Sequence, residues 1–302
     1  VSDVARVLVL QQGARTTPET AFAAARHTLA FLGAPLGAGT DADFYQLNQF
    51  RPSFAGPDFI HWSMNPQVHA SDSLSLMETP EAVPAQLTTA ATVFAGIPLV
   101  VSPITLRPRF NPVATADDDI TSPGVPPLPP QVDPRQTHPL TAAWTLAMIK
   151  HLAESGAESA TFFETTGWRG VMESERGPER PDLLPTTPRQ RFPVYHLLRD
   201  LQTHGTSRVL RSRSSDPLRI QVLVLEGTSD RHLYLANMTP DPQPVRIPVG
   251  SPANPIAAVL LPGSGHGSPA LPDRASNLPV TLPPHGILRL TFTGRPDLPT
   301  PA

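Results

Sequence analysis

The feature of this sequence that most constrains its fold is a regular alternation of short apolar runs with helix-like segments. Five apolar runs precede residue 204, at residues 4–10, 35–40, 58–64, 98–105 and 161–164. Segments with helical spacing of apolar residues lie between and after them, at residues 17–32, 41–49, 79–95, 140–155 and 193–202. Strand and helix in alternation are typical of parallel strands joined by crossover helices. The sequence therefore predicts an α/β fold with a parallel sheet.

The pattern changes after residue 206. Short apolar runs, separated by Gly, Pro, Asp and Asn, occur at residues 208–210, 220–225, 233–236, 245–249, 257–261 and 287–292. Many short strands joined by turns are typical of an antiparallel sandwich. We therefore predict two domains, the C-terminal portion of a (β/α) barrel at residues 1–204 and a β-sandwich at residues 205–302.

A closed (β/α)8 TIM-type barrel needs eight strands, and only five runs precede residue 204. We interpret them as strands four to eight, so that the N-terminal units of the barrel are lacking; the alternative is an open five-stranded sheet. Because an open sheet edge exposes unpaired backbone groups, we expect a second polypeptide or a missing N-terminal segment to complete the barrel.

Composition excludes several classes of function. The chain of 302 residues has a formal net charge of -3, so nothing in its charge predicts binding to nucleic acid or to an anionic membrane. It has no cysteine, which excludes disulfides and thiolate chemistry and fits a cytoplasmic protein. No apolar run approaches the roughly 18 residues of a membrane helix. The histidines show no metal-ligand spacing, so we expect no metal and no cofactor.

Polar side chains follow the predicted strands at the point where each strand ends. They are Asp41 after residues 35–40, Asn65, Gln67, His69 and Asp72 after residues 58–64, Arg107 and Arg109 after residues 98–105, and Glu164 at the end of residues 161–164. In an α/β barrel the C-terminal ends of parallel strands converge on one mouth. We therefore predict one site built from several strand ends, with Asp41, Asn65 and Gln67 among its substrate-binding groups.

His69 is the predicted general base of this site, because imidazole ordinarily titrates near neutral pH. Asp72 is predicted to orient it, and Glu78 is a further candidate carboxylate. Each of the three residues also has an interpretation without a role in catalysis. His69 could be a hydrogen-bonded structural histidine, Asp72 a helix cap, and Glu78 a charge that complements the dipole of a following helix.

Arg107 and Arg109 flank a proline directly after a strand, and guanidinium groups bind carboxylates with two hydrogen bonds. Their structural alternative is a surface pair, or an ion pair with the acidic run at residues 117–119. Glu164 ends an apolar strand, where a carboxylate is costly unless it is paired or functional. Trp168 and Arg169 are predicted to form a wall that stacks against sugar, and loop packing is the alternative.

Five blocks of this sequence resemble the D-apionate lactonase family. They read GTDADF at residues 39–44, NPQVHA at 65–70, LRPRFNP at 106–112, DPRQ at 133–136 and FETTGWRG at 163–170. The resemblance covers roughly residues 33–205 and is specific in residue type and order. It implies the fold of the barrel glycoside hydrolases with an attached β-sandwich, and hydrolysis of a sugar-acid lactone.

Two other functions stay open at this point, a glycoside hydrolase of the same architecture and a non-catalytic carbohydrate-binding protein. A glycosidase uses two carboxylates about 5 to 10 Å apart, which barrel glycosidases of the large clan place after strands four and seven. By our strand count, those ends read Leu10-Gln11-Gln12 and Thr105-Leu106-Arg107 and hold no carboxylate. The sequence therefore favours the lactonase, with general-base activation of water.

Overall fold

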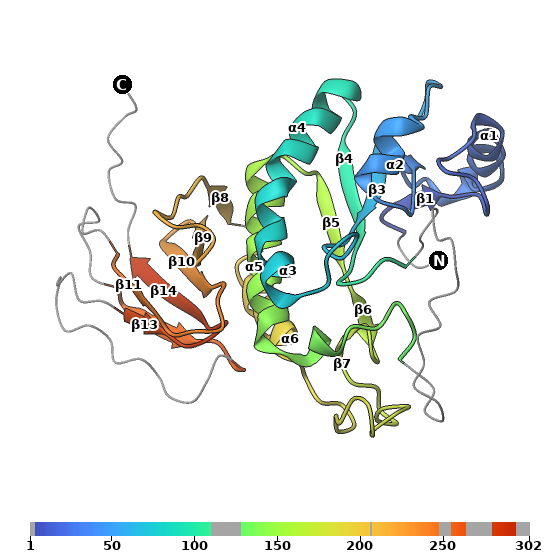
Figure 1. The fold of residues 1–302 in the computed structure, drawn as a ribbon. Coiled ribbons are helices and arrows are strands. Elements are labelled where there is room, and N and C mark those ends of the chain that lie inside the picture. Colours follow the sequence, from blue (N-terminus) through green and yellow to red (C-terminus); the bar gives the residue numbers. More distant parts are fainter. Residues whose placement is uncertain (1–3, 110–127, 206, 248–254, 264–279, 294–302) are drawn as a thin grey trace, which may run out of the picture. The chain divides into compact units, whose positions relative to one another are not determined.

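The computed structural model describes residues 4–109, 128–205, 207–247, 255–263 and 280–293 (Figure 1). The chain divides into two compact units. The first comprises Val1–Asp133 and Ser155–Thr165, and the second comprises Pro134–Glu154 and Thr166–Ala302.

A five-stranded parallel sheet forms the centre of the first unit. Its strands, in spatial order, are β1 (Val7–Val9), β2 (Leu36–Gly39), β3 (Phe59–Met64), β4 (Leu99–Ile104) and β5 (Ser159–Phe162). All four neighbouring pairs are parallel, so the predicted strands and their direction are confirmed. In the described part of the chain, β1 and β5 are the two edges of the sheet and do not pair with each other.

Short helices follow each of the first three strands in this unit. They are α1 (Glu19–Thr28) and η1 (Ala30–Leu32) after β1, α2 (Phe44–Gln49) after β2, and α3 (Ser73–Glu78), η2 (Thr79–Ala82) and α4 (Val83–Val93) after β3. Asp43 begins α2 by accepting a hydrogen bond of 3.1 Å from the Gln46 amide, as a side-chain N-cap does. Thr17 lies just before the Pro18 cap position of α1, and its side chain joins strands. Its hydroxyl donates to the Val9 carbonyl (2.6 Å) and accepts from the Gly39 amide (2.9 Å), which joins β1 to β2.

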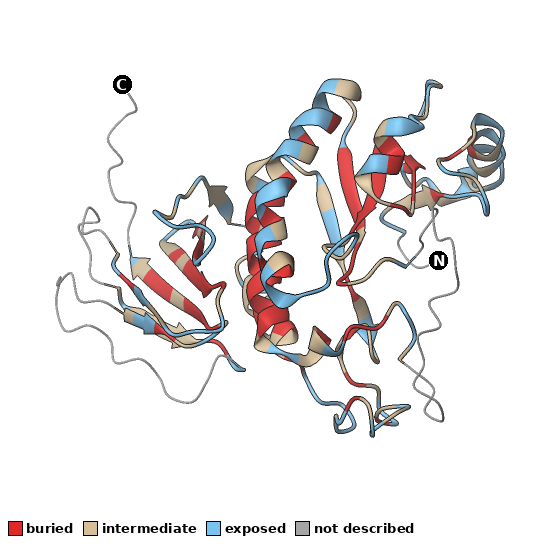
Figure 2. Ribbon diagram, in the orientation of Figure 1, coloured by how far each residue is buried: buried red, intermediate tan, exposed pale blue. Residues whose placement is uncertain are grey.

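The central strands β3 and β4 are buried along most of their length (Figure 2). Trp62 of β3 is fully buried and lies 5.5 Å from the ring of Phe44 in α2, measured between ring centroids. Phe59 and His61 lie on the same side of β3, with ring centroids 6.2 Å apart. A side chain at Gly37 would overlap the Phe59 ring, so β2 needs a glycine opposite this aromatic residue.

His61 makes the stability of the sheet depend on pH. Burial lowers the pKa of His61 from 6.5 to about 4, partly opposed by the nearby backbone groups of Thr40 and Val9. The unfolded chain therefore binds a proton at higher pH than the folded chain does. Neutral His61 therefore costs no stability above pH 6.5, and the free energy of unfolding decreases as the pH falls from 6.5 toward 4. The total decrease is on the order of 3 kcal/mol, since one pKa unit corresponds to about 1.4 kcal/mol.

Urea denaturation should show that the free energy of unfolding of the unmodified protein falls between pH 7.5 and pH 4.5. We expect this fall to be smaller in His61→Gln. His27→Gln is the matched control, because His27 is an exposed histidine in α1. An unchanged pH profile in the His61 variant would contradict this assignment.

The second unit contains an antiparallel sheet with strand order β12-β14-β10-β9-β8. These strands are β8 (Arg208–Leu210), β9 (Ile220–Glu226), β10 (Asp230–Asn237), β12 (Ala257–Leu260) and β14 (Ile287–Thr293). A separate antiparallel pair joins β11 (Gln243–Val245) to β13 (Val280–Leu282). The predicted antiparallel domain is confirmed, although β13 was not among the predicted strands. The run predicted at residues 245–249 begins in β11, and its last two residues lie outside the described residues.

Two helices belong to the same compact unit as this sheet. They are α5 (Pro139–Glu154), preceded by η3 (Pro134–Thr137), and α6 (Pro193–Gln202). Helix α5 is buried along most of its length (Figure 2) and contacts α6, β8, β9 and β10. The compact units therefore divide the chain differently from the predicted boundary at residue 204, because α5 packs on the antiparallel sheet.

Candidate active site at the carboxyl ends of the strands

The carboxyl ends of β3, β4 and β5 lie level with one another. Met64 is in register with Ile104, and Ile104 with Phe162. Beyond this row, the Thr105 amide donates to the Met64 carbonyl and the Phe163 amide to the Ile104 carbonyl, each at 3.0 Å. The residues that follow the three strands therefore leave the sheet on the same side, at the carboxyl ends of the strands. We call this side the carboxyl edge, and it is where α/β barrels place their catalytic residues.

Arg109 and Glu164 meet at this edge. The Arg109 Nη2 atom lies 3.4 Å from the Glu164 Oε1 atom, and the two side chains are 34% and 33% exposed. They follow β4 and β5, two neighbouring strands, as the argument from strand ends predicted. A carboxylate that can accept a proton thus lies beside a cation that can stabilise negative charge, and solvent reaches both.

A second ion pair lies deeper, between Arg107 and Asp133. The Arg107 Nε atom lies 3.6 Å from the Asp133 Oδ2 atom, and the Asp133 side chain is 1% exposed. Gln67 Nε2 donates to the same Oδ2 atom and to the Leu106 carbonyl, each at 2.6 Å. Asp133 was missing from the predicted site residues. The only signal for it in the sequence was its place in the DPRQ block, 24 residues beyond Arg109.

Asn65 directly follows β3 and is half-buried. Its Oδ1 atom is buried and has no hydrogen-bond partner within the described residues. A buried acceptor without a partner is uncommon in proteins, so this atom suits a hydrogen bond from a ligand hydroxyl. Asp41 follows β2 at the same end of the sheet and is also half-buried; its backbone carbonyl accepts a hydrogen bond of 2.7 Å from the Ser63 hydroxyl.

The structure does not bring His69 and Asp72 together as predicted. Asp72 is the exposed N-cap of α3, and its Oδ1 atom accepts a hydrogen bond of 2.9 Å from the Ser75 amide. This bond lowers the pKa of Asp72 below its usual value. His69 is exposed in the loop before α3 and makes no hydrogen bond or ion pair within the described residues. The structural alternative therefore holds for Asp72, because α3 begins at the next residue and the Ser75 amide in its first turn needs an acceptor.

Glu78 lies directly before a helix, as predicted, because η2 begins at Thr79. It is also the exposed last residue of α3. No hydrogen bond or ion pair of its side chain occurs within the described part of the chain. The structure therefore offers no contact that would give Glu78 a role in the site.

The cap role of Asp72 predicts how substitutions behave. Asp72→Ala should reduce hydrogen-exchange protection at the start of α3, because the Ser75 amide loses its acceptor. Asp72→Ser should retain this protection, since serine caps helices as well as aspartate does. Equal losses of protection in Asp72→Ser and Asp72→Ala would contradict the cap role.

Trp168 and Arg169 belong to the second unit. They lie at the turn between β6 (Glu164–Thr166) and β7 (Gly170–Met172), next to Gly167, whose φ is +87°. Both residues are half-buried, and the Trp168 Nε1 atom has no hydrogen-bond partner within the described residues. Their role as a wall that stacks against sugar stays a prediction.

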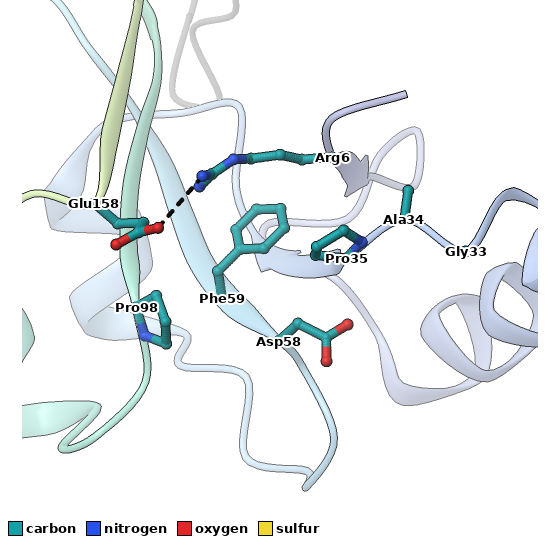
Figure 3. A pocket seen from close by; sticks show the side chains of 8 residues that line it. All are labelled: Arg6, Gly33, Ala34, Pro35, Asp58, Phe59, Pro98 and Glu158. Carbon is teal, nitrogen blue, oxygen red and sulfur yellow. Dashed lines mark hydrogen bonds and ion pairs between the residues drawn. The ribbon is translucent and has the colours of Figure 1, made fainter. Parts of the chain in front are cut away.

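A cavity of about 400 Å³ lies at the opposite ends of the strands (Figure 3). Its lining includes Arg6, Pro35, Asp58, Pro98 and Glu158, which all precede the strands of the sheet, and the Arg6–Glu158 pair spans it at 3.5 Å. Enzymes with parallel α/β barrels act at the carboxyl ends of the strands, and the amino ends usually serve stability. This cavity is therefore not the candidate active site.

Within the described residues, no group of three or more His, Asp or Glu side chains is arranged to hold a metal ion. None of the described helices is both long and apolar enough to cross a membrane. The acidic run at residues 117–119, which we considered as a partner for the arginines, lies outside the described residues.

A parallel α/β sheet with polar groups at its carboxyl edge, followed by an antiparallel domain, defines a barrel protein with an appended β domain. Solved structures show the same fold. A GH30 endoxylanase from Clostridium papyrosolvens C71 matches with a TM-score of 0.55 and 9% identity, over 97% of this chain and 66% of that one. A beta-porphyranase of glycoside hydrolase family 86 from Bacteroides plebeius matches with a TM-score of 0.51 and 11% identity, over 90% and 50%.

The family itself follows from sequence comparison. A family model described as "D-apionate lactonase, TIM barrel domain" matches residues 9–206, and one described as "D-apionate lactonase, C-terminal immunoglobulin-like domain" matches residues 217–290. The chain therefore belongs to the D-apionate lactonase family, and the family resemblance is confirmed. A D-apionate lactonase from Brucella anthropi is 29% identical over 229 residues, which are 76% of this chain. The chain spans 35% of the length of that relative.

Proposed function

We propose that this protein is a hydrolase that opens a sugar-acid lactone, of the D-apionolactone kind, at the carboxyl edge of its parallel sheet. The observation that carries the proposal is the Arg109–Glu164 pair, which joins the ends of β4 and β5 at 3.4 Å. Membership of the D-apionate lactonase family supports the choice of a lactone as substrate.

Lactone hydrolysis needs a base for water and a positive group for the oxyanion. In the proposed reaction, Glu164 accepts a proton from water as the water oxygen bonds to the lactone carbonyl carbon. Arg109 stabilises the negative charge that develops on the carbonyl oxygen. The ring C–O bond then breaks, the leaving alkoxide takes the proton, and the product is an open-chain hydroxy acid.

Glu164 is the preferred base because a neighbouring side chain, Arg109, holds it at the strand end. His69 remains the second candidate, since its loop follows β3 at the same edge of the sheet. Nothing in the described residues orients the imidazole, so His69 would need substrate binding to position it.

The remaining polar groups at this edge suit substrate binding. Asn65 offers to a sugar hydroxyl its buried Oδ1 atom, which has no hydrogen-bond partner among the described residues. Arg107 offers a guanidinium to a carboxylate, which the product of a lactonase carries and its substrate does not. Asp41 is a further candidate contact for a sugar hydroxyl.

The two other candidate functions have less support. A glycosidase needs a second carboxylate about 5 to 10 Å from the first, and Gln11, Gln12 and Arg107 occupy the strand ends where one is expected. The likeness to glycoside hydrolases is at 9% and 11% identity and concerns the fold alone. A binding protein without catalysis would not need convergent charged groups such as Arg109 and Glu164.

The test is proton release by the whole protein on a panel of aldonolactones, with D-apionolactone among them, beside chromogenic glycosides. We expect turnover of a branched pentonolactone and none of the glycosides. Glycoside cleavage, or no lactone turnover by folded protein, would overturn the proposal.

A further inference from the structure

We propose that Asp133 is a positioning residue, which holds Arg107 so that its guanidinium faces the carboxylate of the product acid. This inference rests on the proposed function, because it assigns Arg107 to binding of the acidic group that lactone opening produces. Asp133 itself is too deeply buried to touch the substrate, with its side chain 1% exposed.

A carboxylate buried this far is costly unless charged and hydrogen-bonding groups surround it. Asp133 has both kinds of partner on one atom. Its Oδ2 atom accepts a hydrogen bond of 2.6 Å from Gln67 Nε2 and lies 3.6 Å from Arg107 Nε. Gln67, which follows β3, and Arg107, which follows β4, therefore both hold the Asp133 carboxylate in place.

These contacts join three segments that are distant in sequence. Gln67 follows β3, Arg107 follows β4, and Asp133 precedes η3. Gln67 Nε2 also donates to the Leu106 carbonyl at 2.6 Å, so the loop after β3 is tied directly to the backbone next to Arg107. Both the backbone and the side chain at Arg107 are thereby held.

The orientation of Arg107 suits a ligand. Its Nε atom is buried beside Asp133, while the side chain as a whole is 36% exposed, so the exposed part lies away from Nε. The Arg107 side chain has no other ion pair, and no hydrogen bond, within the described residues. A guanidinium carries five N–H donors in a rigid fork, so contact at Nε leaves terminal amino groups for two bonds to a carboxylate.

A double-mutant cycle on lactone hydrolysis tests this role. Asp133→Asn should raise the inhibition constant of the product acid by about 10-fold, while KM and kcat for the lactone change less. Arg107→Ala should do the same, because both substitutions remove one binding contact. In the Arg107→Ala background, Asp133→Asn should then add less than about 2-fold. Equal effects of Asp133→Asn in both backgrounds would overturn the inference.

Asp200→Asn is the matched control. Asp200 also forms an Asp–Arg pair, with its Oδ1 atom 2.7 Å from Arg289 Nη1, and it accepts a hydrogen bond of 2.7 Å from the Tyr234 hydroxyl. This pair joins α6 to the antiparallel sheet, and we assign it no part in the site. The variant should therefore lower the unfolding midpoint without changing the inhibition constant of the product acid. A rise in that constant with Asp200→Asn would mean that loss of stability alone produces the effect.

A measurement without substrate separates this inference from the proposed function. The Arg107 Nε–H signal in a ¹⁵N NMR spectrum, assigned by its loss in Arg107→Lys, should exchange slowly with solvent. It should exchange faster in Asp133→Asn but not in Asp200→Asn. If this holds and no lactone is turned over, the proposed function fails while the pairing stands. If lactone is turned over and the signal does not respond to Asp133→Asn, the inference fails.

Discussion

Replacing Glu164 with glutamine is expected to lower kcat on the lactone by about 10²-fold or more, the usual effect of losing a general base. Glutamine keeps the size of the side chain and can still accept a hydrogen bond from Arg109. The strand end should therefore keep its structure, and the loss should fall on proton transfer. Initial rates of proton release over a range of lactone concentrations measure it.

Glu158→Gln is the matched control, because Glu158 and Glu164 flank the same strand. Glu158 lies just before the amino end of β5, whereas Glu164 follows its carboxyl end. The Glu158 carboxylate pairs with Arg6 at 3.5 Å. This variant should keep full turnover. Equal losses in the two variants would mean that charge on β5 matters for folding rather than for catalysis.

His69→Ala decides between the two candidate bases. With Glu164 as the base, this variant should lose less than about 10-fold in kcat, an effect below the range for removal of a general base. The reverse result, a 10²-fold loss with His69→Ala and an active Glu164→Gln variant, would transfer the role to His69.

Replacing Trp62 with alanine is the change expected to cost the most stability. Trp62 is fully buried in β3, and its ring packs on Phe44 of α2. Removal of a buried aromatic ring from a core costs about 3–5 kcal/mol, through lost burial and the cavity that remains. Since domains are commonly stable by only about 5–15 kcal/mol, the sheet should be close to unfolding at 37 °C.

Tyr45→Ala is the comparison for this effect. Tyr45 is an aromatic residue of α2 with 63% of its surface exposed. Its loss should change the free energy of unfolding by less than about 0.5 kcal/mol, as is usual for surface substitutions. Urea denaturation of both variants gives the two values, and a similar cost for both would contradict the assignment of Trp62 to the core.

Much of the fold could be predicted because the signals for it are local. Runs such as Phe59–Met64 and Leu99–Ile104 are mostly apolar, without strict alternation, as strands buried on both faces are. The alternation of these runs with helices decides that the strands are parallel. The same local argument placed Arg109 and Glu164 at one edge, because consecutive parallel strands end on the same side.

The sequence by itself thus determined the strands, their direction and the edge where polar groups gather. Only the tertiary structure decided which of those groups meet. Arg109 pairs with Glu164, whereas Asp72 caps a helix and His69 has no hydrogen-bond or ion-pair partner among the residues that the structure describes. Asp133 reaches Arg107 and Gln67 from a segment that no strand pattern marks. The physical reason is that periodicity reports which face of an element is buried, while pairing depends on how loops distant in sequence approach one another in space.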